Sequence, residues 1–328
     1  MISRWNRKGK KAMMAAKIKS MVKKKLLVTG SNGLLGQKIT AAIQADADER
    51  FVYIASSRGA DRYPHPKGYD YVDLDITDAA QVKHILKTYK PDVIINTAAM
   101  ANVDACEREP QKSKQVNVLA VAHLLEQCEA AGIHFIHLST DFVFDGEDGP
   151  YEENDLPNPL NTYGQHKAEA ERLIQAANCP WTIVRTILVY GIVADLSRSN
   201  IVLWAKNALE KGEKITVVND QWRMPTLAED LAKACLTIAD RDAQGIYHIS
   251  GKDLFSICEL VDAVAEHYHL DASFVCKENS AVLKQDAVRP KRTGFILDKA
   301  YEQLDYIPHS FGEGLKLMDE QLKVKIKK

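Results

Sequence analysis

A short apolar run followed at once by three regularly spaced glycines restricts the possible fold more than any other feature of this sequence. Residues 25–29 predict a buried strand, and Gly30, Gly33 and Gly36 follow it before a helix expected over residues 37–45. We expect Gly30 to allow a tight turn, Gly33 to let phosphate oxygens approach the backbone, and Gly36 to let the helix pack closely on a sheet. This order is typical of a dinucleotide-binding α/β domain, and a glycine-rich surface turn is the alternative.

Apolar strands alternate with helical segments as far as about residue 190. Further strands are expected at residues 51–55, 69–74, 92–96, 133–138 and 181–185, with helices ending near residue 89 and spanning about 111–131. Alternation of this kind predicts a doubly wound parallel (Rossmann) sheet whose ligands lie at the carboxyl ends of its strands.

After about residue 191 the alternation becomes less regular. Helices are expected at residues 199–211, 226–240, 256–268 and from 311, and short strands at 215–218, 246–249 and 273–276. These elements predict a smaller C-terminal α/β domain that covers the cofactor edge and binds the substrate. We therefore divide the chain into a basic N-terminal tail (1–24), an NAD(P)-binding Rossmann domain (25–190) and a mainly substrate-binding domain (191–328), interleaved with the first.

Charge and composition limit the partners and the compartment. The first 25 residues hold ten of the 43 Lys and Arg residues and no acid, so the remaining chain is acidic and does not suggest binding to nucleic acid. We interpret the tail as an over-called start codon or a disordered arm, with a membrane-surface or targeting role as the alternative. No apolar run approaches the roughly 18 residues of a membrane span. Six Cys without a C-x-x-C pair and ten unclustered His predict reduced thiols, no metal site and a cytoplasmic protein.

The second strand ends in Ser57 and Arg58, where an acidic residue would bind a ribose 2′-hydroxyl. A hydroxyl and a guanidinium suit a 2′-phosphate, so the sequence leans towards NADPH over NADH, although a solvated Arg58 is the alternative. Asp75 is placed to meet the adenine, or is a loop carboxylate. The residues expected to bind the cofactor are Gly30, Asn32, Gly33, Leu34, Leu35, Gly36, Ser57, Arg58, Asp75, Ile76, Thr97, Ala98, Ala99, Tyr163 and Lys167.

Tyr163 and Lys167 stand four residues apart in a segment of good helix formers, so both side chains lie on one helix face. An ammonium beside a phenol favours the phenolate and lowers the tyrosine pKa from about 10. Tyr163 then becomes a usable acid near neutral pH, and Thr140 can give a substrate carbonyl a second hydrogen bond. A surface Tyr beside a solvated Lys is the alternative, but the expected strand ends bring all three residues to the edge of the glycine turn.

Several motifs resemble the dTDP-4-dehydrorhamnose reductases, a family of extended short-chain dehydrogenases/reductases. The resemblance covers nearly the whole chain from about Lys24. It rests on the three glycines and on residues 96–99 (Asn-Thr-Ala-Ala), 101–107, 139–146 (Ser-Thr-Asp-Phe-Val-Phe-Asp-Gly), 159–164, 219–221, 225–226 and 289–293.

The resemblance implies reduction of a 4-keto group on a nucleotide-linked deoxysugar with NADPH or NADH. Tyr163 would be the acid, Lys167 would lower its pKa and bind the nicotinamide ribose, Thr140 would orient the carbonyl, and Asn117 would support Lys167 through water. The residues expected to bind substrate are Asn102, Asp141, Phe142, Asn200, Arg223 and Arg289. The last two are candidates for binding the diphosphate, or else form ion pairs. Pairing of the 111–131 and Tyr163 helices would make a homodimer.

Two departures from the family pattern fall where the sugar should bind. Ile187 and Leu188 occupy the stretch in which the reductases have a Trp, and residues 222–224 are more basic than the pattern. Two alternative functions stay open. A dehydratase or epimerase would need a proton-transferring residue where Phe142 stands, and a cofactor-binding regulatory subunit would use the same fold without turnover.

Overall fold

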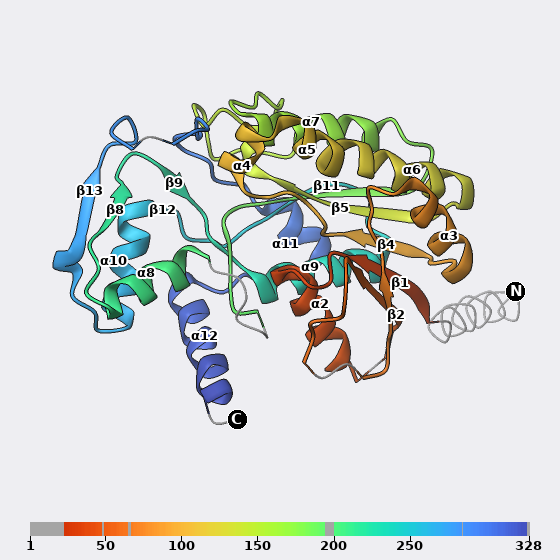
Figure 1. Ribbon diagram of the computed structural model, residues 1–328, viewed down its shortest axis with the longest axis horizontal. Helices are drawn as coiled ribbons and strands as arrows, with labels where there is room; N and C mark the ends of the chain where they lie inside the picture. The colour runs from red at the N-terminus through yellow and green to blue at the C-terminus, as the bar shows by residue number, and fades with distance from the viewer. Residues whose placement is uncertain (1–22, 48, 65–66, 194–199, 284, 327–328) are drawn as a thin grey trace, which may run out of the picture.

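The central element is a seven-stranded parallel sheet in a computed structural model that describes residues 23–47, 49–64, 67–193, 200–283 and 285–326 (Figure 1). Its strands are β1 (Lys24–Thr29), β2 (Phe51–Ser57), β3 (Asp70–Asp73), β4 (Val93–Asn96), β5 (His134–Thr140), β6 (Trp181–Thr186) and β11 (Gly245–Ile249). The order is β11-β6-β5-β4-β1-β2-β3, and every neighbouring pair is parallel. The order reverses between β1 and β4, as in a doubly wound fold, so the predicted fold class is confirmed.

Helices cover both faces of the sheet (Figure 1). On one face lie α3 (Ala79–Tyr89), α5 (Pro110–Lys114), a π-helical segment (Gln115–Leu119), α6 (Ala120–Ala131) and α7 (Thr162–Gln175), with α4 (Val103–Arg108) beside them. On the other face lie α2 (Leu34–Gln44), α9 (Ala228–Arg241) and α11 (Asp298–Leu304). Each face therefore has its own buried apolar cluster, as a three-layer α/β fold requires.

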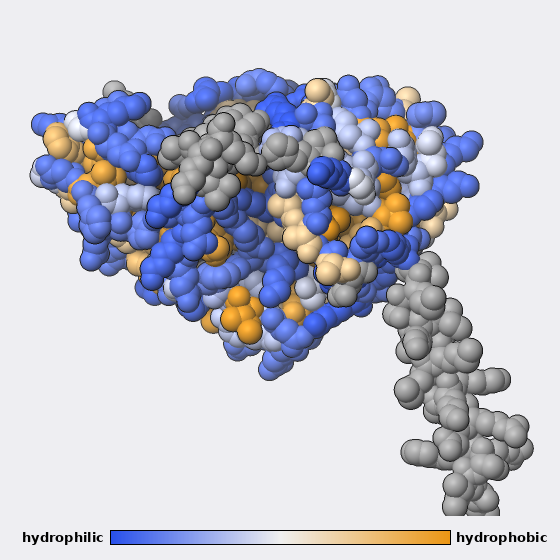
Figure 2. Space-filling model, turned by 90° about the horizontal axis from the view of Figure 1, so that it is seen from below, coloured by the Kyte–Doolittle hydropathy of each residue, from blue (hydrophilic) through white to orange (hydrophobic). Residues whose placement is uncertain are grey.

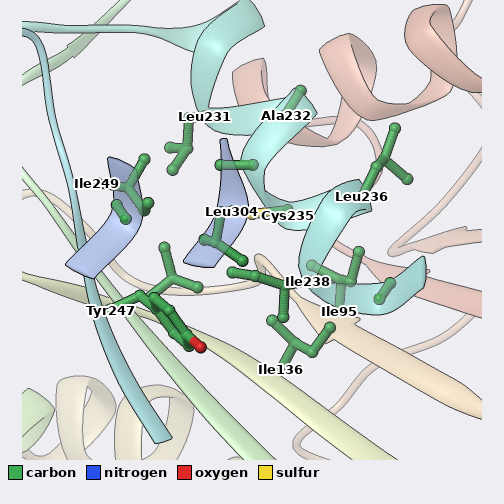
Figure 3. Close-up of a cluster of buried hydrophobic side chains, with 14 of the residues drawn as sticks. Ile95, Ile136, Leu231, Ala232, Cys235, Leu236, Ile238, Tyr247, Ile249 and Leu304 are labelled. Carbon is green, nitrogen blue, oxygen red and sulfur yellow. The ribbon is translucent and has the colours of Figure 1, made fainter. Parts of the chain in front are cut away.

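The cluster on the α9 face joins the two halves of the chain (Figure 3). Ile238 of α9 points towards Ile95 and Ile136 of the sheet, whereas Leu231 lies on the side of Ile249. These side chains are at most 1 % exposed. Burial of an aliphatic side chain of this size contributes about 1.5–3 kcal/mol. The late helix α9 is thus part of the core of the first domain, which fixes where the rest of the C-terminal half lies.

The smaller lobe lies at one end of the sheet (Figure 1). It contains α8 (Ile201–Glu210), α10 (Ile257–His267), α12 (Phe311–Ile326), the 3₁₀ turn Ala272–Phe274 and three two-stranded pairs: β8 (Ile215–Val218) with β13 (Val275–Glu278), β7 (Val189–Tyr190) with β10 (Thr226–Leu227), and β9 (Trp222–Arg223) with β12 (Phe255–Ser256). The lobe has a third buried cluster of its own. Seen from below, its surface is mostly polar, with apolar residues in small separate patches (Figure 2).

Four features differ from the sequence expectation. The strand expected at residues 246–249 is β11, the edge strand of the main sheet, and does not belong to the smaller lobe. The expected 111–131 helix contains one π-helical turn, and α2 begins about one turn earlier than predicted. The helices α4 and α11 were not predicted, since each spans only six or seven residues and shows too little periodicity. Within the described ranges, no helix is long and apolar enough to cross a bilayer.

Candidate active site

The glycine turn has close contacts, as expected, but Gly36 packs the helix against the turn itself, where packing against the sheet was expected. Gly30 has φ +72°, and a Cβ there would lie 2.8 Å from Ala98 N and Thr97 Oγ1, so Gly30 lets the ends of β1 and β4 meet. A Cβ on Gly36 would lie 2.5 Å from Gly30 O and Ser31 Cα, so this glycine packs α2 against its own turn. Gly33 is the N-cap of α2, whose N-terminal N–H groups can attract phosphate.

A pocket that is open to solvent lies beside this turn. Its lining residues are Gly30, Gly33, Ser57, Arg58, Leu74, Asp75, Ile76, Thr77, Thr97, Ala98, Ala99 and Val116. Nine of these were predicted to bind the cofactor, and they come from the carboxyl ends of β1, β2, β3 and β4 or the turns that follow. A pocket with a glycine turn at one side and polar groups at the tip of β2 fits a dinucleotide.

Two predicted cofactor residues shape the pocket through contacts with other parts of the chain. Asn32 is buried, donates from Nδ2 to Ala60 O (2.9 Å) and accepts from Arg62 N (2.9 Å), so it holds the loop after β2. Asp75 Oδ1 accepts from Thr77 N and Oγ1, and its Oδ2 lies 3.9 Å from Arg58 Nη1. The Arg58 side chain is 75 % exposed, so it remains available to an anion at the pocket mouth.

Tyr163 lies beside Thr140 because the first turn of α7 packs tightly on the turn after β5. A Cβ on Gly164 would lie 2.1 Å from Phe142 O, so only glycine permits this approach. Asn161 caps the helix by accepting from Gly164 N, and Glu107 accepts from Thr162 N. The sequence analysis did not single out Gly164, whose signal is its place directly after Tyr163.

The pKa of Tyr163 differs from expectation. Burial raises it above the usual 10, and a hydrogen bond with Thr140 only partly opposes this shift. The Phe142 ring packs edge-on to Tyr163 at 6.2 Å between centroids, which adds to its apolar surroundings. Thr140 itself donates to Asp141 Oδ1 (3.1 Å) and accepts from Phe142 N (3.2 Å). The sequence analysis considered only the nearby ammonium and not the cost of burying a phenolate.

Lys167 is buried and held by β5. Its Nζ donates to Leu138 O at 2.5 Å and lies 2.9 Å from His137 Nε2. Burial lowers the pKa of Lys167 to about 8, although Glu171 acts in the opposite direction. His137 of β5 is thus the side-chain neighbour of this amine.

Asn117 lies on the π-helical segment and braces the wall of the pocket. Its Oδ1 accepts from Met100 N (2.9 Å) and its Nδ2 donates to Met100 O (3.0 Å), so both amide atoms hold the loop that follows Ala98 and Ala99. Turns of π-helix often mark functional positions in long helices. Among the residues that the structure describes, no hydrogen bond joins Asn117 directly to Lys167.

Asp141 and Arg223 form a buried cluster and do not face an open diphosphate site. Arg223 Nε lies 3.6 Å from Asp141 Oδ2, and its guanidinium donates to Pro290 O (2.8 Å) and Trp222 O (2.7 Å). Asp141 Oδ2 also accepts from Thr293 Oγ1. Burial raises the pKa of the Asp141 carboxyl and lowers that of Arg223. Arg223 therefore ties the 290–293 segment to the turn after β5, and its expected phosphate contact stays a prediction.

The other candidates for substrate binding occupy helix ends or an ion pair. Asn102 and Asn200 cap α4 and α8, and Asn200 also donates to Gly191 O. Arg289 pairs with Asp104 and donates to Ala287 O. Asp104 and Glu107 are the two acids at the end of the 101–107 motif. Asp104 pairs with Arg289, and Glu107 accepts a hydrogen bond from the first turn of the Tyr163 helix.

The pocket includes three residues that the sequence analysis did not name: Leu74, Thr77 and Val116. Val116 precedes Asn117, and the other two flank the predicted pair 75–76, so proximity to named residues was the available signal. No group of three or more His, Cys, Asp or Glu residues capable of holding a metal ion occurs among the residues described.

Comparison with known proteins identifies the family. The sequence model of the RmlD substrate binding domain matches residues 24–324. The chain belongs to this family. The predicted membership of the extended short-chain dehydrogenases/reductases is thereby confirmed.

Solved structures of two reductases resemble this RmlD-family chain over most of its length. A dTDP-4-dehydrorhamnose reductase from Clostridium acetobutylicum is 28 % identical, with TM-score 0.78, covering 91 % of this chain and 99 % of that one. The Bacillus anthracis reductase in complex with NADP is 25 % identical, with TM-score 0.77, covering 92 % and 100 %.

Among curated proteins, a probable low-salt glycan biosynthesis reductase, Agl14 from Haloferax volcanii, is 32 % identical over 81 % of this chain and 87 % of its own. A methionine adenosyltransferase 2 subunit beta from Xenopus tropicalis is equally 32 % identical, over 76 % and 74 %. The family thus includes proteins named as reductases and proteins named as subunits.

Proposed function

We propose that this protein uses NADPH or NADH to reduce a keto group on a nucleotide-linked sugar. The observation that carries the proposal is that the pocket beside the glycine turn and the Thr140–Tyr163 pair both lie at the carboxyl edge of one sheet, in a chain of the RmlD family. Reductases with a known fold cover nearly all of the chain, which supports the same chemistry.

In this function, each residue at the sheet edge has one task. The pocket binds the dinucleotide, which would supply the hydride when bound. Tyr163 gives its phenolic proton to the carbonyl oxygen, and Thr140 directs that oxygen towards it. Lys167, as an ammonium, would stabilise the phenolate that remains. In the cofactor-free protein burial raises the pKa of Tyr163, and Thr140 is the hydrogen-bond partner that opposes this shift.

The preference for NADPH rests on Ser57 and Arg58. Arg58 is exposed at the pocket mouth, with Asp75 as its nearest carboxylate at 3.9 Å. A guanidinium can form two hydrogen bonds with a 2′-phosphate, which NADH lacks. Arg58→Ala should therefore weaken NADPH binding about tenfold and leave NADH affinity nearly unchanged, as measured by cofactor fluorescence titration. Equal losses for both cofactors would contradict this role.

We further propose a cytoplasmic homodimer, with residues 191–328 mainly binding the substrate. The acidic composition after the tail and the reduced cysteines support the compartment. Leu119 and Leu173, on the helical layer of α6 and α7, are 47 % and 39 % exposed, which supports pairing of these helices. Sedimentation of the full chain measures the oligomeric state directly, and a monomer at micromolar concentration would exclude the dimer.

The experiment that tests the function is a screen of NADPH and NADH oxidation with a panel of 4-keto deoxysugar nucleotides that differ in sugar and base. We expect saturable oxidation with at least one of them, and net cofactor consumption that matches product formation. Tight retention of NAD with no net consumption would instead indicate a dehydratase or epimerase.

A cofactor-binding subunit of another enzyme is the second candidate. Relatives named methionine adenosyltransferase 2 subunit beta favour it. Mixing the protein with a methionine adenosyltransferase catalytic subunit tests it by gel filtration. A stoichiometric complex, together with no turnover of any keto-sugar nucleotide, would replace the reductase proposal.

A further inference from the structure

A row of four buried polar side chains runs from β1 to α7, and the mechanism above uses only the last of them. Thr29 Oγ1 donates to Asn96 Oδ1 at 2.6 Å, and Asn96 Nδ2 lies 3.1 Å from His137 Nδ1. His137 Nε2 lies 2.9 Å from Lys167 Nζ. All four residues are at most 2 % exposed. The row passes through three neighbouring strands and ends at the amine beside the candidate active site.

The donors and acceptors along this row fix the imidazole in one form. Thr29 uses the Asn96 carbonyl oxygen, so the amide nitrogen of Asn96 faces His137 and donates to Nδ1. A neutral imidazole has one N–H, which must then be on Nε2, directed at Lys167 Nζ. Burial keeps the pKa of His137 well below its usual 6.5, so the ring is neutral.

A donating Nε2–H needs a lone pair on its partner. The Lys167 nitrogen has a lone pair only as a neutral amine, and its own N–H groups then reach Leu138 O. The imidazole and the carbonyl oxygen thus hold the amine at the end of β5 in the cofactor-free protein. An ammonium in the same place would face the hydrogen of Nε2.

We propose that His137 is a positioning residue for the reduction: oriented by Asn96 and Thr29, it holds Lys167 against β5 and favours the neutral amine over the ammonium in the cofactor-free protein. The proposal rests on the proposed function, because Lys167 has a catalytic task only in that reaction. His137 is buried and does not line the pocket described above, so it acts through Lys167.

The charged groups around Lys167 do not explain why its pKa is lowered. Glu171, one turn further along α7, favours the ammonium, but Arg185 of β6 neutralises it in a buried ion pair of 2.7 Å. Cys106 of α4 also favours the ammonium, and burial raises the pKa of its thiol, which keeps it uncharged. Burial is the main cause of the lowered Lys167 pKa of about 8. In the proposal, the imidazole N–H directed at Nζ acts in the same direction.

The test uses cofactor-free protein labelled with ¹⁵N-histidine or ¹³C-lysine, with His137 and Lys167 signals assigned by their loss in His137→Gln and Lys167→Met. We expect the His137 proton on Nε2 and Lys167 titrating near pH 8. In His137→Gln the new amide can turn its oxygen to an ammonium, so the Lys167 titration should move up by about one pH unit. Asn96→Leu keeps His137 but removes the amide that fixes its tautomer. The Lys167 titration should therefore also move to higher pH in this variant.

His134→Gln is the matched control, since His134 is equally buried on β5 but contacts Thr182 and not Lys167. Its Lys167 titration should equal that of the wild type. A His137 proton on Nδ1, or one Lys167 titration shared by all variants, would overturn the proposal.

Neither measurement needs turnover, so their failure is distinct from a failure of keto-sugar reduction. In the active enzyme, reduction needs the Lys167 ammonium, so kcat/KM falls as pH rises through the Lys167 pKa. His137→Gln should shift this fall in kcat/KM to higher pH by about one unit, with kcat at low pH retained.

Discussion

Asp104 and Arg289 lie 185 residues apart in the sequence and form a two-bonded ion pair, with Nη1–Oδ1 at 3.1 Å and Nη2–Oδ2 at 2.7 Å. Asn161, the cap of α7, donates to the neighbouring Val288 O at 2.7 Å. These contacts fasten the 287–289 segment to α4 and to the start of the helix that carries Tyr163. The late segment is thereby held beside the candidate active site.

Removing the carboxylate of this pair should cost stability in a pH-dependent manner. Arg289 holds the pKa of Asp104 below its usual value, so the pair stabilises the fold above about pH 4 and is lost as pH falls through the lowered pKa. We expect Asp104→Ala to reduce the free energy of unfolding by about 1 kcal/mol at pH 7, and by less near pH 3. Urea unfolding at both pH values measures this. Asp286→Ala, which breaks an exposed pair with Arg108, is the control and should change nothing measurable.

Acid should destabilise the protein through its buried histidines. Burial lowers the pKa of His134 to about 4 in the fold. In the unfolded chain the same imidazole takes up a proton below about pH 6.5. The stability that His134 contributes is complete above pH 6.5 and is lost as pH falls towards 4, a difference of about 3 kcal/mol. Unfolding free energies of His134→Gln should fall less steeply over this interval than those of the wild type. Parallel curves would show that His134 is already charged in the fold.

Two glycines in the first turns of helices should respond oppositely to alanine. A Cβ on Gly36 would meet backbone atoms at 2.5 Å, whereas one on Gly312 of α12 would meet nothing within 4 Å. Gly36→Ala should cost about 1–3 kcal/mol through overpacking and weaken cofactor binding. Gly312→Ala should stabilise by about 0.5–1 kcal/mol. Thermal unfolding and NADPH titration measure both effects, and equal behaviour of the two variants would contradict the close packing of α2 on its turn.

Local patterns in the sequence predicted the parts of the fold and site that depend on neighbouring residues. The glycine turn, the strands of the first half and the helix carrying Tyr163 and Lys167 all follow from spacing and propensity within a few residues. The edge strand β11 could not be placed, because its partner β6 lies more than fifty residues earlier and no local signal sets that pairing.

Local patterns did not suffice where burial decides a side chain's role. No local pattern indicated that three backbone carbonyls and Asp141 surround Arg223 in the fold, and its expected phosphate contact stays a prediction. Tyr163 was expected to have a lowered pKa from its distance to Lys167 along the helix, but His137 and Leu138 hold that amine. Both outcomes depend on contacts between segments far apart in the sequence.

The most direct measurement compares NADPH oxidation by the wild type and Tyr163→Phe with a 4-keto deoxysugar nucleotide that the wild type turns over. The phenylalanine ring keeps the packing on Phe142 but has no proton to give. We expect kcat to fall by roughly 10²–10⁴-fold with NADPH affinity retained. Undiminished kcat in Tyr163→Phe would contradict the assignment of Tyr163 as the acid.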